Sequence, residues 1–401
     1  MGKLKAFFIC AAALSCPILI CTSSSAGEVL RTAAYFSSGA LPADGINFKL
    51  LEKTDSDIVS DHSSNSGLGN TSNSSDTSGS NSSAVSEPKN SSGFESVTSE
   101  AAANNLPVNS AKVIDKNRTG NLDETDYSKF NKQTGIIYRY AFGRSSAGDY
   151  INLSSGAQVR NVTAKPNSLL EEASTQLPDI KITDPETEPA VLIYHTHTTE
   201  SFMPDGDMYD KDYPNRSRDD SRNMTAVGDA LCKALAENGV TTVHDCTVHD
   251  YPQYTGAYKL SAKTIQQNLE EYPGIKIIID IHRDGIANAD GSLVAPVVEI
   301  NGRNAAQFMI ISGCDCEAFS IPHYLENVKL ACLLQNTSES LYPNLARSVL
   351  FDYREYNQSM RPGILLIEVG SHGNSLEEVT YTGELLGNII AQAVKQLTVD
   401  S

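Results

Sequence analysis

The chain has 401 residues and a formal net charge of -18 at pH 7, with 49 acidic and 31 basic residues. This acidic balance disfavours binding to the phosphates of nucleic acids and to anionic membrane surfaces, because both carry the same sign of charge. The eight cysteines stand at uneven spacing, so the sequence predicts no disulfide framework.

A targeting segment opens the chain. Lys3 and Lys5 precede an apolar run that ends at Cys21, and small residues then lead to Ala26. A basic start, an apolar run and a small-residue site together make up an export signal. The run is shorter than the about 20 residues of a membrane span. We therefore expect residues 1–26 to be a signal peptide or a signal anchor, with the rest of the chain outside the cytoplasm.

Residues 27–135 are predicted to be a tether. After a short mixed segment, Ser, Asn, Asp, Thr and Gly dominate from residue 54 to about 133, and the run 70–83 contains no apolar residue. Such a segment cannot bury enough apolar surface to offset its chain entropy. We expect it to be mostly disordered and to join the N-terminal segment to a globular domain at 136–401.

Hydrophobic periodicity predicts alternating strands and helices in the globular part. We expect strands at 136–142, 150–162, 191–194, 240–243, 275–281, 295–300, 306–312 and 364–369, and the strands at 295–300 and 306–312 should form a hairpin about Asn301 and Gly302. Helices are expected at 167–176, 224–238, 261–272, 322–340 and 375–397. From Val191 onward, the alternation of strands and helices predicts an α/β fold, a three-layer α/β/α domain with a mostly parallel sheet.

The third, the fifth and the last of these strands are strongly apolar and end in groups suited to zinc chemistry. These groups are His195, His197 and Glu200, then His282, and then Glu368. If the strands are parallel neighbours, their carboxyl ends share one edge of the sheet. Two histidines and one glutamate would bind Zn2+ and leave a fourth position for water. Because side chains alternate along a strand, His195 and His197 face the same way, so the pattern leaves open which of them is the ligand.

Glu368 is the candidate general base. A carboxylate in an apolar strand is costly unless it has a partner, so Glu368 is either ion-paired or functional. As the base, it would take a proton from the attacking water and pass it to the leaving nitrogen. Plainer interpretations also stand for the other groups. Residues 197–200 fit a helix start with a threonine cap and a solvated glutamate, and His282 fits a structural histidine beside Arg283.

Five blocks of the sequence resemble those of the stage II sporulation protein P family, a group of membrane-anchored peptidoglycan hydrolases. In chain order they are YHTHTTES, HDCTVHD, IIDIHRD, YNQSMRPG and LLIEVGSHGN. The family is similar to the zinc-dependent N-acetylmuramoyl-L-alanine amidases, so the resemblance implies Zn2+ as the cofactor. His282 matches the second ligand block of those amidases, and Glu368 opens the third, with Ser371 in place of phenylalanine. The first block differs, because HTHTTE stands in place of a glycine-rich loop and a more distant glutamate.

The resemblance implies hydrolysis of the amide that joins N-acetylmuramic acid to the first L-alanine of the stem peptide, and of peptide crosslinks as well. It also implies action at the sporulation septum during engulfment, by a membrane-anchored or secreted protein that faces the cell wall. Stage II sporulation proteins D and M are the partners that it implies.

Three residues in or near the blocks are candidates for substrate contact, namely Arg283, Asn223 and Asn357. They would bind stem-peptide carboxylates or amides, or else brace the loops. Two other functions stay open. A zinc carboxypeptidase is one, because the spacing of His197 and Glu200 also resembles the ligand pair of those enzymes, and a catalytically silent wall-binding module is the other.

Overall fold

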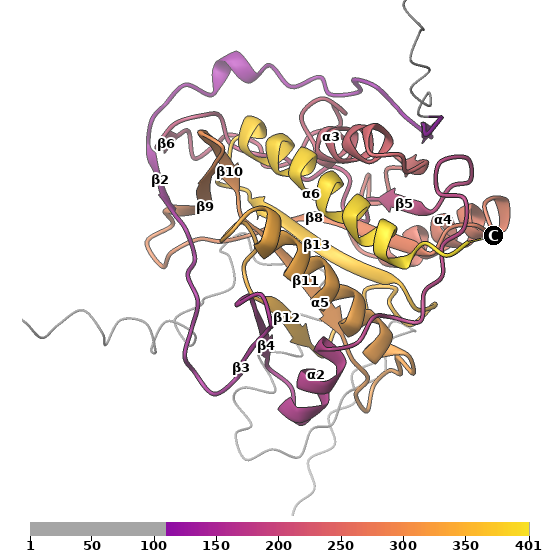
Figure 1. Cartoon of the computed structure of the whole chain (residues 1–401). Coiled ribbons are helices and arrows are strands. Elements are labelled where there is room, and N and C mark those ends of the chain that lie inside the picture. Colours follow the sequence, from indigo (N-terminus) through magenta and orange to yellow (C-terminus); the bar gives the residue numbers. More distant parts are fainter. Residues whose placement is uncertain (1–109, 401) are drawn as a thin grey trace, which may run out of the picture. The chain divides into compact units, whose positions relative to one another are not determined.

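The computed structural model describes residues 110–400 (Figure 1). The expected signal segment and most of the expected tether lie outside these residues. Within them, no helix combines the length and the apolar character that crossing a membrane requires. All five cysteines of this part are free thiols.

A nine-stranded sheet forms the centre of the fold. Its order is β1 (Val113–Lys116), β7 (Thr242–Asp245), β5 (Val191–Tyr194), β8 (Ile277–Asp284), β13 (Ile364–Ser371), β11 (Phe308–Gly313), β12 (Val349–Asp352), β4 (Gln158–Asn161) and β3 (Tyr150–Asn152). Neighbouring strands are parallel except at the β13–β11 and β4–β3 pairs. The predicted mostly parallel sheet is therefore confirmed.

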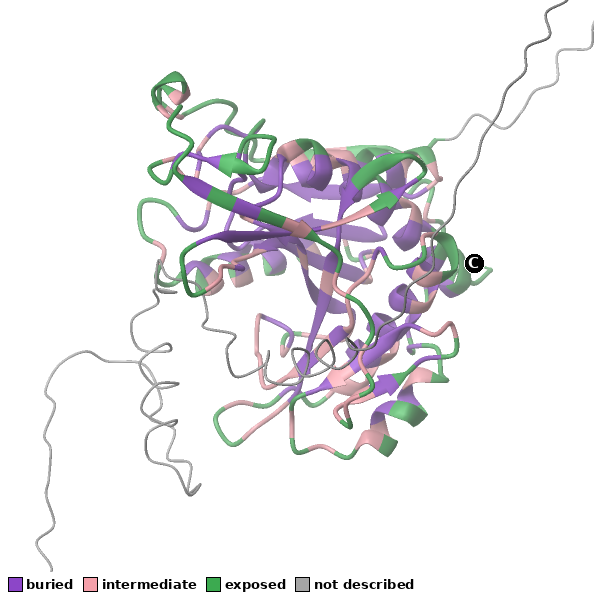
Figure 2. Ribbon diagram, turned by 90° about the vertical axis from the view of Figure 1, so that its left-hand side faces the viewer, coloured by how far each residue is buried: buried purple, intermediate pink, exposed green. Residues whose placement is uncertain are grey.

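Helices cover both faces of this sheet (Figure 1). They are α2 (Asn167–Ser174), α3 (Met224–Glu237), α4 (Ala257–Glu271), α5 (Tyr324–Leu341) and α6 (Leu376–Leu397). Alternation along β8 shows the two faces, since Ile277 and Ile279 join the core under α3, α5 and α6, whereas Ile278 joins the core under α4. Apolar side chains thus cover each face of the sheet, and the central strands β5, β8 and β13 are almost entirely buried (Figure 2). The three-layer α/β/α prediction is confirmed.

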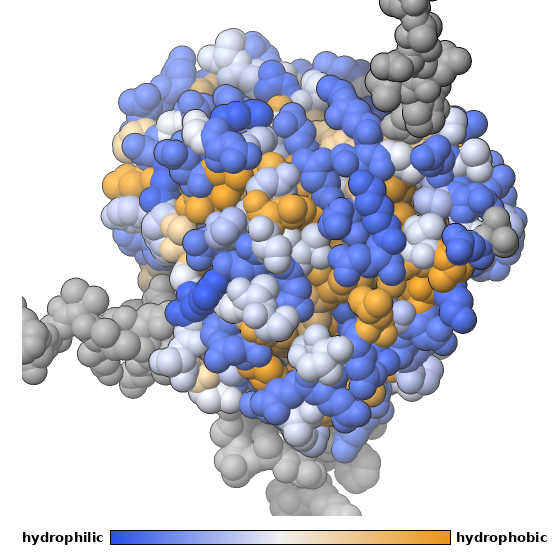
Figure 3. Space-filling view, viewed as in Figure 1, coloured by the Kyte–Doolittle hydropathy of each residue, from blue (hydrophilic) through white to orange (hydrophobic). Residues whose placement is uncertain are grey.

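A smaller sheet packs beside α6. It has the order β10 (Arg303–Ala306), β9 (Leu293–Ile300), β2 (Gly135–Tyr140) and β6 (Met208–Tyr209). An ion pair between Arg139 of β2 and Glu378 of α6 joins the two elements. Hydrophilic residues cover most of the face that α6 crosses, with hydrophobic residues showing between them (Figure 3).

The structure corrects one predicted hairpin. We expected 295–300 to pair with 306–312, but β9 pairs with the short β10 across the turn at Asn301. The next strand, β11, returns to the large sheet antiparallel to β13. Gln307 is the one residue between β10 and β11, and its buried amide donates to the backbone carbonyls of Phe142 and Asn344. One apolar run therefore serves two sheets.

Ordered structure also begins before the expected boundary at residue 136. β1 pairs in parallel with β7 and forms an edge of the large sheet. Just after it, Arg118 forms ion pairs with Asp115 and with Asp229 of α3. The domain that we placed at 136–401 thus includes a strand that we had assigned to the tether.

Candidate active site at the ends of three strands

The three strands that carry the candidate zinc groups are direct neighbours. β5 pairs in parallel with β8, and β8 pairs in parallel with β13. Asp280 lies opposite Tyr194, and His282 lies opposite Glu368. Their carboxyl ends therefore meet at one edge of the sheet, as the sequence predicts.

His197 and Glu200 reach this edge from the turn that follows β5. The backbone N–H of Glu200 donates to the His197 carbonyl at 3.1 Å, which closes the turn. The His197 ring stands edge-on to His282, with 5.2 Å between ring centroids, and stacks on Tyr254 at 4.2 Å. Glu200 Oε2 lies 3.7 Å from His282 Nδ1 and accepts the backbone N–H of Arg283. The turn thus delivers an imidazole and a carboxylate to His282.

Asp280 fixes the orientation of His282. Its Oδ1 lies 2.9 Å from His282 Nε2, and the carboxylate also accepts the N–H and the hydroxyl of Thr196. Burial alone would lower the pKa of His282, but the charge of Asp280 and its hydrogen bond outweigh burial and raise this pKa to about 9. With Nε2 turned to Asp280, the other ring nitrogen, Nδ1, faces Glu200. A ligand histidine oriented by a carboxylate has this arrangement.

Glu368 lies beside His282 on β13. One of its oxygens, Oε2, is shut off from solvent and has no hydrogen-bond partner. Burial, followed by the charge of Asp284, raises the pKa of Glu368 to about 8. A bulge follows at once, where Gly370 adopts a left-handed φ of 63°. A Cβ there would lie 2.7 Å from Asn374 Oδ1, so only glycine lets the strand turn away directly after Glu368.

His195 lies apart from this group, so the expectation that both histidines face the same way fails. The His195 ring bonds the Ile281 carbonyl through Nδ1 at 3.1 Å and His244 through Nε2 at 3.0 Å. Residues after β5 leave the strand and enter a turn, so strand alternation no longer relates His195 to His197. Of the two histidines, the structure brings His197 to the strand-end edge.

The three candidate substrate residues have local partners. Arg283 donates to the backbone carbonyls of Asn215 and Asp284, which braces two loops. Asn223 caps α3 by accepting the N–H of Thr225. Asn357, which is also buried, donates to Ser261 and to the Tyr258 carbonyl on α4. Their hydrogen bonds hold the framework of the site in place.

Several residues of the site were missed in the sequence. Arg216 lies 2.6 Å from Asp250 and 3.8 Å from Glu200, and its guanidinium covers the Tyr254 ring. The Tyr258 ring stacks parallel to His282. These residues come from loops and from α4, where no periodicity marks them. A signal did exist for Asp280, because a carboxylate inside the run IKIIIDI needs a partner as much as Glu368 does.

We tested whether these residues fit a metal ion. Burial, followed by the positive charge of His282, lowers the pKa of His197 to about 2, so its imidazole is neutral, as a ligand must be. The pKa of His282 is raised, so a metal ion bound there would displace the proton from the Nδ1 of its ring. His197 Nδ1 is buried and has no hydrogen-bond partner, and the same is true of Glu368 Oε2. Two imidazoles and a carboxylate are the donor set of catalytic zinc. His197, Glu200 and His282 therefore carry the donor types of a catalytic zinc site.

A second group offers metal ligands elsewhere. Among residues 110–400, Asp115, His244 and Cys246 place three ligand atoms within 4.8 Å of one another, and the strand-end groups are not that close. Two observations argue against a metal ion there. Arg118, already a cation, donates to Asp115 at 2.6 Å. Burial also raises the pKa of the Cys246 thiol, which disfavours the thiolate that a metal needs.

Comparisons with known proteins show similarity to one family. The family model of stage II sporulation protein P matches residues 65–391. Stage II sporulation protein P of Bacillus subtilis (strain 168) is 29% identical over 213 residues, which is 50% of this chain and 50% of that protein. The chain thus spans about half the length of this curated relative.

Solved amidase structures are also similar in part. The CwlD amidase from Clostridioides difficile, in complex with the GerS lipoprotein, matches with a TM-score of 0.33 and 12% identity, over 52% of this chain and 98% of that chain. An N-acetylmuramoyl-L-alanine amidase from Clostridium difficile 630 matches with a TM-score of 0.31 and 16% identity, over 52% of this chain and 96% of that chain.

Proposed function

Because the chain belongs to the stage II sporulation protein P family, we propose that it is a zinc-dependent peptidoglycan hydrolase of sporulation. Its main reaction is hydrolysis of the amide between N-acetylmuramic acid and the first L-alanine, and peptide crosslinks are a second target. The observation that carries this proposal is the meeting of His197, Glu200 and His282 with Glu368 at the ends of three adjacent strands.

The residues of the site divide the work. His197, Glu200 and His282 hold the metal, and Asp280 keeps the His282 ring turned so that Nδ1 faces Glu200. Bound there, Zn2+ supplies a Lewis acid that polarises a carbonyl and makes water acidic near neutral pH. In its ionised form, which the positive charge of a bound metal would favour over the raised pKa, Glu368 accepts the proton of the attacking water at the unpartnered Oε2 and returns it to the leaving nitrogen. The stack of Tyr254 on His197 keeps bulk water from that side of the site.

The same proposal includes location and partners. We place the action at the sporulation septum, with residues 1–26 directing export, residues after them reaching toward the wall, and the protein membrane-anchored or secreted. Stage II sporulation proteins D and M are the proposed partners. Their role rests on the resemblance of the sequence blocks to the family.

Incubation of the purified chain with isolated peptidoglycan, with and without a zinc chelator, tests this function. Mass spectrometry of the soluble products should find intact stem peptides with free L-alanine amino termini, and the chelator should abolish them. A fall of crosslinked dimers to monomers would add the endopeptidase activity. Release of single amino acids would instead identify a carboxypeptidase, and wall binding without cleavage by the zinc-loaded chain would contradict an enzymatic role.

A further inference from the structure

A cavity of about 340 Å³ adjoins the strand-end site and plays no part in the roles given so far. Its wall includes Tyr254, whose ring stacks on His197, and Arg216, which lies 3.8 Å from Glu200. The cavity therefore lies directly beside the candidate ligands His197 and Glu200. A substrate whose amide is placed at Glu200 and His282 has this space next to it.

Two carboxylates on the wall of the cavity, those of Asp250 and Asp123, already have partners. Arg216 lies 2.6 Å from Asp250, whose carboxylate also accepts the Thr199 hydroxyl. Asp123 accepts the hydroxyls of Tyr127 and Ser217. These two carboxylates therefore already have hydrogen-bond donors within the protein.

Arg218 differs from these groups. It lines the cavity with its guanidinium 4.4 Å from the centroid of the Tyr251 ring. Within residues 110–400, its side chain has neither an ion pair nor a hydrogen bond. Tyr251 is itself 52% exposed, so the pair stands at the open side of the cavity. A guanidinium held over an aromatic ring can still bind a carboxylate through two parallel hydrogen bonds from its N–H groups.

We propose that Arg218 is a specificity-determining residue that binds a carboxylate of an acidic peptide in this cavity. The inference rests on the proposed function, since the stem peptides of peptidoglycan carry carboxylates close to the scissile amide. Tyr251 holds the guanidinium in place, and Tyr254 separates the carboxylate from the metal ligands. The peptide side of the substrate thus lies over Arg218.

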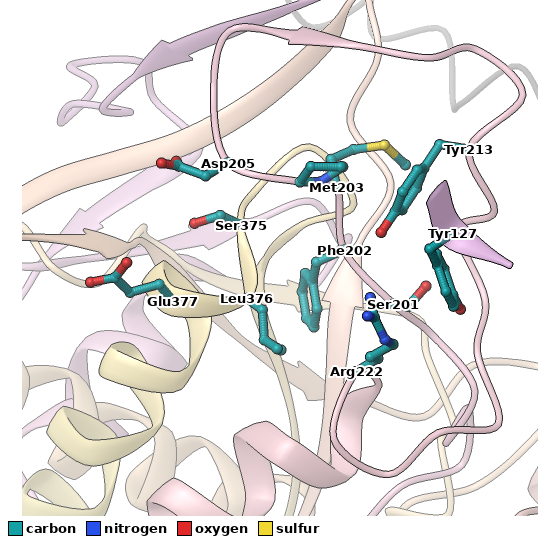
Figure 4. Close-up of a pocket in the computed structure, with 11 residues that line it drawn as sticks. Tyr127, Ser201, Phe202, Met203, Asp205, Tyr213, Arg222, Ser375, Leu376 and Glu377 are labelled. Carbon is teal, nitrogen blue, oxygen red and sulfur yellow. The ribbon is translucent and has the colours of Figure 1, made fainter. Parts of the chain in front are cut away.

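Another arginine of the same loop provides a matched control. Arg222 lies over the Tyr127 ring at 4.2 Å, but it pairs with Asp219 and lines a different cavity of about 210 Å³. Figure 4 shows that cavity, where Arg222 lies near Phe202 and Leu376 at the start of α6. Replacing Arg222 removes the same charge from the same loop and leaves the proposed subsite intact.

The test compares two muramoyl-peptide substrates that differ only in one group of the second peptide residue, a free carboxylate or its carboxamide. Wild-type chain should favour the carboxylate by about ten- to a hundredfold in kcat/KM, the range of a charge-assisted hydrogen bond. Arg218→Gln should lose this preference by raising KM for the acidic substrate, with kcat kept. Tyr251→Ala should weaken the preference, and Arg222→Gln should retain it.

The outcomes separate the two ideas. Equal wild-type activity on both substrates, or an equal loss on both in Arg218→Gln, would overturn the role of Arg218 and leave the hydrolase in place. A loss of preference in Arg222→Gln would also overturn it, because a general charge effect would then suffice. If wild-type chain cleaves neither substrate, the proposed function falls and the inference falls with it.

Discussion

Asp280 is a fully buried carboxylate that follows three isoleucines in β8. It persists there because Thr196 and His282 surround it with donors. A buried carboxylate without such partners would cost several kcal/mol, and it would be protonated instead of staying charged. One acid therefore connects the turn after β5 to the histidine of β8, and the position of His282 depends on it.

Glu368 has the role that a single substitution tests most simply. Glu368→Gln keeps the shape of the side chain but removes the proton acceptor, so hydrolysis should fall by about a hundredfold or more. Zinc content should stay at the wild-type level, because His197, Glu200 and His282 are unchanged. The measurement pairs product release from peptidoglycan with metal analysis of the same sample. Glu384→Gln, an exposed site on α6, is the matched control and should retain full activity.

Retained hydrolysis in Glu368→Gln would remove the base assignment. Loss of zinc together with activity would instead make Glu368 a ligand. These two results would assign different roles to Glu368, so both hydrolysis and zinc content must be measured.

The two histidines after β5 should respond differently to replacement. His197→Ala removes a proposed ligand, and zinc affinity should fall by more than the about 10–100-fold that loss of an outer partner produces. His195→Ala leaves His244 Nε2 without its buried partner and opens a cavity, so the free energy of unfolding should fall by about 2 to 4 kcal/mol. Its zinc affinity should stay near that of the wild type.

Zinc titration and denaturant unfolding of both variants check this pair. If His195→Ala loses zinc while His197→Ala retains it, the ligand assignment is reversed. The sequence left open which histidine is the ligand. The structure favours His197, because both ring nitrogens of His195 already have partners.

At the scale of elements, the contact between α3 and α6 is set by small residues. Gly383 and Gly387 of α6 face α3 closely, and a Cβ on Gly387 would lie 2.5 Å from the Leu231 carbonyl oxygen and 2.5 Å from Ala234 Cβ. The two helices therefore approach backbone to backbone over the sheet (Figure 1). Because α6 starts directly after the block that carries Glu368, its position also fixes the end of β13.

Gly387→Ala should destabilise the domain. Overpacking costs about 1 to 3 kcal/mol, and the better helix propensity of alanine returns up to about 1 kcal/mol. We expect a net loss of about 1 to 2 kcal/mol in the free energy of unfolding, measured by urea denaturation. Gly143→Ala is the control, because nothing lies within 4 Å of a Cβ there, and it should change stability by less than about 0.5 kcal/mol. Equal effects of the two variants would show that the helices can move apart freely.

For the whole molecule, the sequence predicted most of the layers and the meeting of the strand ends. The runs at Val191, Ile277 and Ile364 are apolar on both faces, and such strands belong inside a parallel sheet. Once they are neighbours, their ends must meet. Pairing between short strands was harder to predict, because β1 and β12 are only four residues long and their partners are distant in sequence.

The site was predicted less completely than the fold. His282 and Glu368 follow from strand position, whereas the ring directions of His195 and His197 depend on a turn that periodicity does not describe. Arg216, Arg218 and the tyrosines come from irregular loops and a distant helix, and only folding brings them to the strand ends. Local patterns specify elements, but contacts between loops require the whole chain.

The extent of the domain leads to a whole-molecule prediction. A chain that begins at residue 136, where the sequence suggests the boundary, lacks β1 and leaves the edge of β7 unpaired. It also lacks the ion pairs of Arg118. Relative to a chain that begins at residue 110, its free energy of unfolding should be lower by about 2 to 4 kcal/mol, from the lost backbone hydrogen bonds. Equal urea midpoints for the two chains would mean that β1 adds nothing to the fold.

The claim on which the function depends is that His197, Glu200 and His282 hold zinc. Anomalous diffraction at the zinc absorption edge, from crystals grown with one equivalent of Zn2+, tests it directly. We expect a single peak among these three side chains, next to Glu368. A peak at Asp115, His244 and Cys246, or no peak among the strand ends, would contradict the account.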